Sequence, residues 1–134
     1  MVFVMKIQRK VGSHSVFRLN YHLVLCTKYR RKILIDDIDF QIREIFSKIS
    51  QSNSINIIEM NSDKDHIHIL FATDPTANLT KYINSLKTVS SRLIQKEYPQ
   101  PNRLFWSRSY FLSTVGEVSL ETIQNYIQTQ GESK

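Results

Sequence analysis

His66 and His68 are the two residues of this chain whose type and spacing point most directly to chemistry. They lie at the start of an apolar run that ends at Phe71, and such a run predicts a β-strand. Alternate residues of a strand point to the same side of a sheet, so the two imidazoles can bind a single metal ion. The same spacing also fits two surface histidines that bind nothing.

A second pair, Tyr126 and Gln130, lies near the end of the sequence in an amphipathic segment. Residues four apart share one face of a helix, so we expect the phenol and the amide side by side. Gln130 falls within the apolar stripe of this helix, where an amide needs a polar partner. A metal ion or another part of the backbone would serve equally. Tyr126 lies at the edge of the stripe, so simple packing also explains it.

Together these four residues predict a site for metal-assisted nucleophilic attack on a phosphodiester. Two imidazoles and an amide oxygen leave open coordination positions, as a catalytic metal requires. An oxygen ligand and a phosphate substrate favour Mg²⁺ or Mn²⁺, although imidazoles would also accept Zn²⁺ or Cu²⁺. Tyrosine has an ordinary pKa of about 10, so a nearby cation is needed to favour the phenolate. The sequence offers no obvious general base beside Tyr126.

The basic residues are concentrated in the first quarter of the sequence. The formal net charge is +6, and residues 1–35 hold eight basic residues and no acidic one. This asymmetry predicts nucleic acid as a partner, although a solvated basic face would have the same composition. Only three glycines occur and they form no phosphate-binding loop, so we expect no nucleotide cofactor. The residues expected to contact DNA are Arg18, Lys28, Arg30, Arg31 and Lys32.

Length and composition predict the number of domains and the cellular compartment of the protein. The 134 residues suit one domain, spanning 1–134, with an ordinary apolar core. No apolar run reaches the roughly 20 residues of a membrane span, and the first residues do not read as a signal peptide. The single cysteine, Cys26, is expected to pack within a strand and suits a reducing compartment. We therefore expect a cytoplasmic protein with no membrane partner.

Hydrophobic periodicity predicts the elements that must position these residues. A C-terminal helix over residues 117–134 would carry Tyr126, and residues 1–14 would form a mobile basic arm. The aromatic residues at positions 105, 106 and 110 are expected mainly to pack in the core. The remaining elements are strands over residues 16–28, 55–61, 66–72 and 104–115, and helices over residues 38–51 and 79–98.

The resulting β-α-β-β-α-β order predicts an α+β fold of the ferredoxin-like type, with one additional C-terminal helix. In such a fold two helices cover one face of an antiparallel sheet. Ile67, Ile69 and Phe71 would pack beneath those helices, so His66 and His68 are expected to point to the uncovered face. Asp65 has the opposite parity, and we expect no role for it at the metal.

Several pieces of the sequence resemble the single-tyrosine HUH transposases of small bacterial and archaeal insertion sequences. The similarity extends over roughly residues 15–130. Its most specific part is the combination of two motifs, one around the histidines and one around Tyr126. The matching pieces are Tyr21-His22, residues 27–30, residues 65–70 and residues 123–130.

The resemblance implies a transposase that cleaves and rejoins single-stranded DNA, with a divalent metal and without ATP. By motif match, His66, His68 and Gln130 would be metal ligands, and Tyr126 would be the nucleophile that forms a 5′-phosphotyrosine link. The resemblance further implies a homodimer that recognises subterminal hairpins. In such a dimer a tyrosine helix can complete the partner's site.

Two other functions fit part of the sequence. A non-catalytic or domesticated protein that binds hairpins or single strands would use the same basic residues. Its sheet should carry stacking aromatic residues, where the third strand of this chain carries histidines. A small metal-binding regulatory protein would explain His66 and His68, but not the basic segment or the pair Tyr126 and Gln130. Intact motifs alone do not separate an active transposase from an inactivated one.

Overall fold

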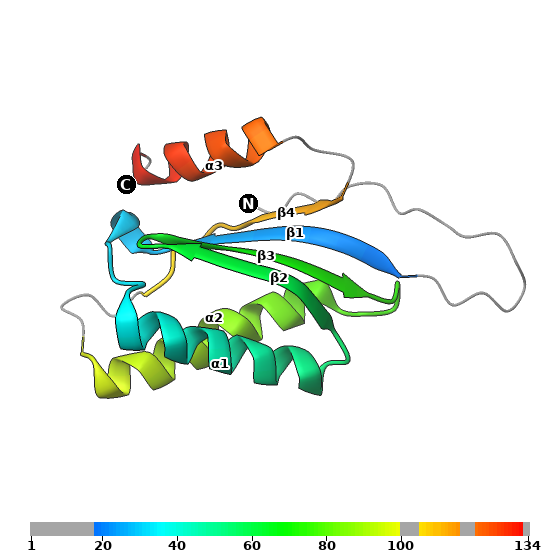
Figure 1. Cartoon of the computed structure of the whole chain (residues 1–134), viewed down its shortest axis with the longest axis horizontal. Helices are drawn as coiled ribbons and strands as arrows, with labels where there is room; N and C mark the ends of the chain where they lie inside the picture. The colour runs from blue at the N-terminus through cyan, green and yellow to red at the C-terminus, as the bar shows by residue number, and fades with distance from the viewer. Residues whose placement is uncertain (1–17, 100–104, 116–119, 133–134) are drawn as a thin grey trace, which may run out of the picture.

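The computed structural model describes residues 18–99, 105–115 and 120–132, without the side chains at positions 120 and 130–132. The basic arm predicted over residues 1–14 lies outside the described residues. A four-stranded antiparallel sheet forms the centre of the molecule (Figure 1), with strand order β2-β3-β1-β4. Its strands are β1 (Leu19–Cys26), β2 (Asn56–Asp63), β3 (His66–Thr73) and β4 (Phe111–Thr114).

Helices lie on both faces of this sheet (Figure 1). Two long helices, α1 (Asp36–Ser52) and α2 (Leu79–Glu97), cover one face, and α3 (Leu120–Glu132) lies on the other. A short 3-10 helix, η1 (Lys28–Arg30), follows β1 directly. The element order and the strand order are those of a ferredoxin-like sheet, so the predicted α+β fold is confirmed. None of the helices in the described ranges has the length and apolar character of a membrane span.

The main core lies between the sheet and the pair α1 and α2. Alternate residues of β1 and β3, such as Leu23 and Ile69, point into it and are fully buried. The helices contribute Phe46 and Leu86 among others. Because a strand alternates its faces, the residues between these positions must point to the other side of the sheet, where α3 lies.

Local signals explain where the two long helices begin. Three aspartates stand in the first turn of α1, where negative charge is favoured by the helix dipole. The helix α2 is capped by Asn78, whose side chain accepts a hydrogen bond of 3.0 Å from the backbone N–H of Lys81. Both helices were predicted within a few residues of these boundaries.

The fourth strand is shorter than the sequence predicts. Only four residues pair with β1, from Val24 opposite Phe111 to Tyr21 opposite Thr114, because residues 107–110 do not follow the regular register with the last two residues of β1. A single bridge between Thr27 and Trp106 continues the contact. The aromatic residues Phe105, Trp106 and Tyr110 are buried in the main core, as expected.

The second face of the sheet is partly covered, which corrects the expectation of an uncovered face. A small apolar cluster holds α3 against the sheet and draws only on β1 and β4. The strand β3, which carries both histidines, contributes no residue to this cluster. The cluster consists of Val24, Cys26, Phe111 and Ile123, with Tyr126 and Ile127 packed against it.

Candidate active site

His66 and His68 point to the face of the sheet that carries α3. Their neighbour Ile67 is fully buried in the main core, whereas both histidines are partly exposed. In the sheet register, His66 lies opposite Cys26 of β1 and His68 lies opposite Val24. Directly paired residues share a face, so the two imidazoles lie beside the cluster that holds α3.

His68 has a third histidine as its partner. Nδ1 of His22 on β1 lies 2.9 Å from Nε2 of His68, and the two ring centroids are 5.0 Å apart. One nitrogen must donate and the other accept, so the pair requires at least one neutral ring. Burial lowers the pKa of both rings, and each is opposed by a weaker upward effect of Glu59. Neutral imidazoles are the form that binds a metal.

His66 is held by an acidic neighbour, contrary to the expectation for Asp65. Nδ1–H of His66 donates to Oδ1 of Asp65 over 2.9 Å. Burial would raise the pKa of Asp65, but the hydrogen bond from His66 and the charge of Arg30 outweigh it and lower the pKa. Asp65 lies in the turn between β2 and β3, not in a strand. The alternation of strand faces therefore does not apply to its side chain.

Arg30 of η1 joins this carboxylate to α3. Its Nε and Nη2 lie 3.0 and 2.9 Å from Oδ2 of Asp65, and its Nη1 donates to the carbonyl oxygen of Ile127 over 2.6 Å. Ile127 directly follows Tyr126 in α3. A chain of polar contacts thus runs from His66 through Asp65 and Arg30 to the helix that carries the predicted nucleophile.

Tyr126 contacts residues of β4 and of the segment before it. Its ring packs beside Phe111 with centroids 5.5 Å apart, and its hydroxyl lies 3.2 Å from Oγ of Ser109. Both contacts are on the β4 side of the sheet. Burial raises the pKa of the phenol to about 12, although the hydrogen bond with Ser109 lowers it slightly. Across the described residues, no hydrogen bond or ring contact links Tyr126 to His66 or His68.

Gln130 belongs to the same helix as Tyr126, one turn further along, as predicted. Its side chain lies outside the described part of the structure. Among the described side chains, no group of three histidines, cysteines or acidic residues could hold a metal ion. The donors still suit a divalent cation, because Asp65 occupies Nδ1 of His66 and leaves its Nε2 for a ligand role. A third ligand would have to be of another type, such as an amide, or a phosphate oxygen of the substrate.

The five basic residues predicted to contact DNA do not form one cluster. Arg18 precedes β1 and donates to the carbonyl of Ala72, while the other four lie at the opposite end of that strand, in and after η1. Lys28 is buried, with its ammonium 5.2 Å from the ring centroid of Tyr29. Arg31 donates to the carbonyl of Lys28, and Lys32 is exposed.

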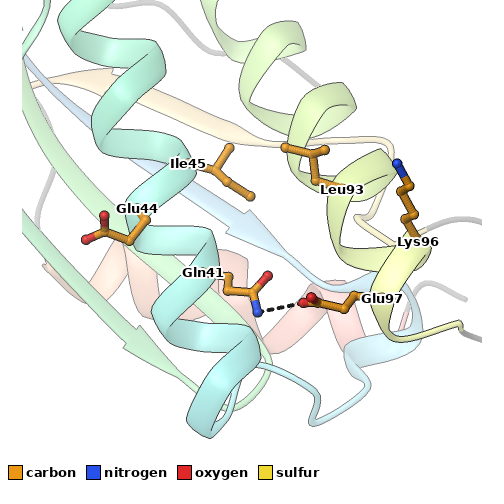
Figure 2. A pocket seen from close by; sticks show the side chains of 6 residues that line it. All are labelled: Gln41, Glu44, Ile45, Leu93, Lys96 and Glu97. Carbon is orange, nitrogen blue, oxygen red and sulfur yellow. Dashed lines mark hydrogen bonds between the residues drawn. The ribbon is translucent and has the colours of Figure 1, made fainter.

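Figure 2 shows the lining of a groove between α1 and α2, the helices on the face of the sheet opposite to the one that carries α3. The side chains of Ile45 and Leu93 line its floor, and Nε2 of Gln41 donates to Oε1 of Glu97 over 2.8 Å. The remaining lining residues, Glu44 and Lys96, are charged. Nothing in this lining resembles the histidine and tyrosine chemistry of the other face, so the groove is not the candidate active site.

A ferredoxin-like sheet with two histidines on one strand and a tyrosine helix on the same face is the arrangement expected of a transposase. A family model described as IS200-like transposases matches residues 15–130, and the chain belongs to this family. The ISDra2 transposase TnpA of Deinococcus radiodurans is 29% identical over 136 residues, which cover 98% of this chain and 97% of the relative. The transposase of insertion sequence IS200 from Salmonella typhimurium is 30% identical over 125 residues, covering 90% and 82%.

Solved structures agree with this assignment. The crystal structure of a candidate transposase from Deinococcus radiodurans R1 superposes with a TM-score of 0.81 at 30% identity, covering 91% of this chain and 98% of that one. A REP-associated tyrosine transposase bound to a REP hairpin superposes with a TM-score of 0.59. It covers 89% of this chain and 68% of that one at 9% identity, so this second likeness concerns the fold alone.

Sequence reasoning missed the partners of the two histidines. The contact of His22 with His68 depends on the register in which β1 pairs with β3. That register is not visible in one sequence. Asp65 could have been found, because an acidic residue next to a metal-binding histidine is a common partner for its second nitrogen.

Proposed function

We propose that this transposase cleaves and rejoins single-stranded DNA at the ends of an insertion sequence, with Tyr126 as the nucleophile. The observation that carries the proposal is the shared face of the sheet: His66 and His68 point to the same side on which the helix of Tyr126 packs. The family supports the general activity. The particular chemistry and the roles of the residues are the proposed part.

The proposed reaction exchanges one phosphodiester for another. The phenol oxygen of Tyr126 attacks a backbone phosphorus atom, an O–P bond forms, and the bond from phosphorus to the 3′ oxygen breaks. The phenol gives up its proton and the departing 3′ oxygen takes one, so a 5′-phosphotyrosine and a free 3′-hydroxyl result. Because the number of ester bonds is unchanged, a second 3′-hydroxyl can reverse the step and join new strands without ATP.

His66, His68 and Gln130 would hold the divalent cation, for which Mg²⁺ or Mn²⁺ is proposed. When bound, this cation would withdraw charge from the scissile phosphate and favour phenolate. The protein contributes the orientation of both rings. Asp65 fixes Nδ1 of His66 as the protonated nitrogen, and His22 contacts the ring of His68.

We propose that α3 moves before the reaction, so that Tyr126 reaches the metal site. Its hydroxyl contacts Ser109 on the β4 side, and a phenol with a pKa of about 12 is a poor nucleophile at neutral pH. Only a small apolar cluster holds α3 on the sheet. We propose that α3 acts within a homodimer, where it can bring Tyr126 to the histidines of its own chain or to those of the partner.

Subterminal DNA hairpins are the proposed ligand of the basic residues. Lys32 is exposed at one end of β1. At the other end Arg18 is exposed too, although one of its nitrogens already donates to the carbonyl of Ala72. A hairpin bound to both residues would span this strand. Such contacts would position the DNA and carry little sequence information. A fold relative bound to a REP hairpin supports this class of ligand.

The test is the formation of a covalent protein–DNA adduct. The chain is incubated with single strands from the DNA that flanks its gene, with Mg²⁺, with Mn²⁺ or with a chelator, and then run on a denaturing gel. We expect a metal-dependent adduct that Tyr126→Phe abolishes. Tyr98→Phe is the matched control, because that hydroxyl bonds Asp37 at the far side of the main core. Binding without an adduct, on strands shown to contain the true element ends, would favour a non-catalytic hairpin-binding or single-strand-binding protein instead.

A further inference from the structure

We propose that Asp65 and Arg30 are positioning residues that couple the orientation of His66 to the docking of α3. The inference rests on the proposed function, because it takes His66 as a metal ligand and α3 as the carrier of Tyr126. It assigns Arg30 a structural task within the site, in place of the DNA contact that its charge alone suggests.

The first half of the coupling is the bond between Asp65 and His66. A carboxylate can only accept, so Nδ1 of His66 must carry the proton in the 2.9 Å contact with Oδ1. In the neutral form of the ring the lone pair is then on Nε2. A carboxylate behind a metal-binding histidine is a common device for fixing the ring and its tautomer.

The second half is the bond between Arg30 and α3. The guanidinium uses Nε and Nη2 for Oδ2 of Asp65, and it uses Nη1 for the carbonyl of Ile127. The two oxygens of Asp65 are therefore divided, one for His66 and one for Arg30. The carbonyl that Arg30 reaches belongs to the residue directly after Tyr126 in α3.

The backbone of η1 holds Arg30 in a conformation that costs free energy. Tyr29 and Arg30 have φ angles of 61° and 54°, in the left-handed region that most residues avoid. Thr27 fixes this turn, because its backbone N–H donates to the carbonyl of Asp65 and its hydroxyl donates to the carbonyl of Arg31. The turn that carries Arg30 is thus anchored to the residue that Arg30 pairs with.

The guanidinium of Arg30 therefore contacts both the carboxylate that holds His66 and the backbone of α3. When α3 leaves the sheet, Arg30 loses the carbonyl of Ile127 and Asp65 loses part of the restraint on its carboxylate. When Asp65 is removed, Arg30 loses the partner that aims it at α3. A disturbance at either end should therefore be measurable at the other.

Two measurements on the full-length protein, without metal or DNA, report the two ends separately. The nitrogen shifts of the His66 ring report which nitrogen is protonated. The labelling rate of Cys26 with a thiol reagent reports the undocking of α3, because this single cysteine is buried in the cluster beneath that helix. Burial raises the pKa of its thiol to about 12, so labelling requires an opening of the structure.

Arg30→Gln and Asp65→Ala are the informative variants. We expect each to raise Cys26 labelling by about tenfold or more, which corresponds to the loss of a hydrogen bond with a charged partner. We also expect each to shift the His66 ring from protonation at Nδ1 towards a mixture of tautomers. Arg30→Lys keeps the positive charge, but a single ammonium cannot reproduce the bonds of the guanidinium to both Asp65 and the carbonyl of Ile127. It therefore tests the coupling if Arg30→Gln or Asp65→Ala fails to fold.

Arg43→Gln is the matched control. Arg43 pairs with Asp39 and donates to the carbonyl of Met60 and to Oγ of Ser62, so it also joins a carboxylate to a backbone carbonyl, but on α1, across the sheet from α3. This variant should leave both readouts at their wild-type values. Variants of Arg30 that match it, or that change Cys26 labelling while the His66 tautomer stays fixed, would overturn the coupling.

The outcome is separable from that of the proposed function. Coupled readouts in a wild-type protein that forms no DNA adduct would contradict the transposition chemistry and leave the positioning pair intact. An adduct that forms normally in Arg30→Gln, with both readouts unchanged, would contradict the positioning pair alone.

Discussion

At the scale of single residues, the site depends on which ring nitrogen each histidine leaves free. His66 gives Nδ1 to Asp65, and His68 turns Nε2 towards His22. The two rings are thus held by different partners, one anionic and one neutral. The pair of His22 and His68 has the more marked pH dependence, because burial lowers the pKa of both rings.

The free energy of unfolding should therefore fall as the solution is acidified below the ordinary histidine pKa of about 6.5. The unfolded chain takes up protons at both rings there, while the folded protein resists them, so the stabilisation present above that pH is lost as pH falls through the lower folded values. Urea unfolding from about pH 7.5 to about pH 5 measures this loss. His22→Phe should flatten the dependence, and equal slopes in the two proteins would contradict the assignment.

Residue types and spacing located the histidines, the tyrosine and the glutamine, but not their partners. Asp65 was dismissed by a parity argument that holds only inside a strand, and the structure places it in a turn. The direction of the Tyr126 side chain could not be predicted either. It depends on where α3 crosses the sheet, and that crossing is decided by apolar contacts among β1, β4 and α3.

At the scale of elements, periodicity predicted the four strands and three α-helices of the described residues, but it missed the 3-10 helix η1 and misjudged some lengths. The strand β4 is the largest error, since aromatic and β-branched residues over 104–115 suggest a long strand. Several of those residues are apolar because they pack in the main core, while regular pairing with β1 begins only at Phe111, opposite Val24. Propensity alone does not distinguish packing from pairing.

The start of α2 offers a test of one local signal. Asn78→Ala removes the side-chain acceptor for the backbone N–H of Lys81, so the protein should lose about 1 kcal/mol of unfolding free energy. Denaturant unfolding measures the loss. Asn78→Asp keeps an acceptor at the same position and should restore most of the stability. An Asn78→Ala variant as stable as the wild type would contradict the prediction, because water would then satisfy the backbone N–H of Lys81 equally well.

The docking of α3 can be separated from the folding of the sheet. Ile123→Ala removes a buried side chain from the cluster under α3, a change that typically costs 2–5 kcal/mol, here estimated at about 2 kcal/mol because the cluster is small. We expect faster labelling of Cys26 with little change in thermal midpoint. Ile94→Ala makes the same chemical change in the main core and should lower the midpoint. Equal midpoints for the two variants would mean that both clusters unfold together.

At the scale of the whole molecule, exposed basic residues lie at both ends of β1. Arg18 lies before the strand and Lys32 lies after η1, so DNA held by both must cross the strand. Composition predicted the nucleic-acid partner of the family but could not predict this separation. It follows from the extended geometry of β1, which only the fold reveals.

Salt dependence should reveal which lysine contacts DNA. If Lys32 neutralises one phosphate, Lys32→Gln should weaken hairpin binding and reduce the slope of log affinity against log salt by about one. Lys48, exposed on α1, serves as the control, and Lys48→Gln should keep the wild-type slope. Titrations of a labelled hairpin at several salt concentrations give both slopes. A reduced slope in the control variant would point to a general charge effect.

The division of the apolar residues into a large core and a small cluster under α3 has a consequence for inheritance. If Tyr126 is the nucleophile, as proposed, its loss inactivates the protein but disturbs the small cluster and not the main core, so such a gene copy still specifies a folded sheet and an intact set of histidines. Such a copy would persist in a genome without being purged for misfolding. Its product would compete with that of an intact copy for the same DNA ends, and defective elements would thereby restrain the spread of active ones.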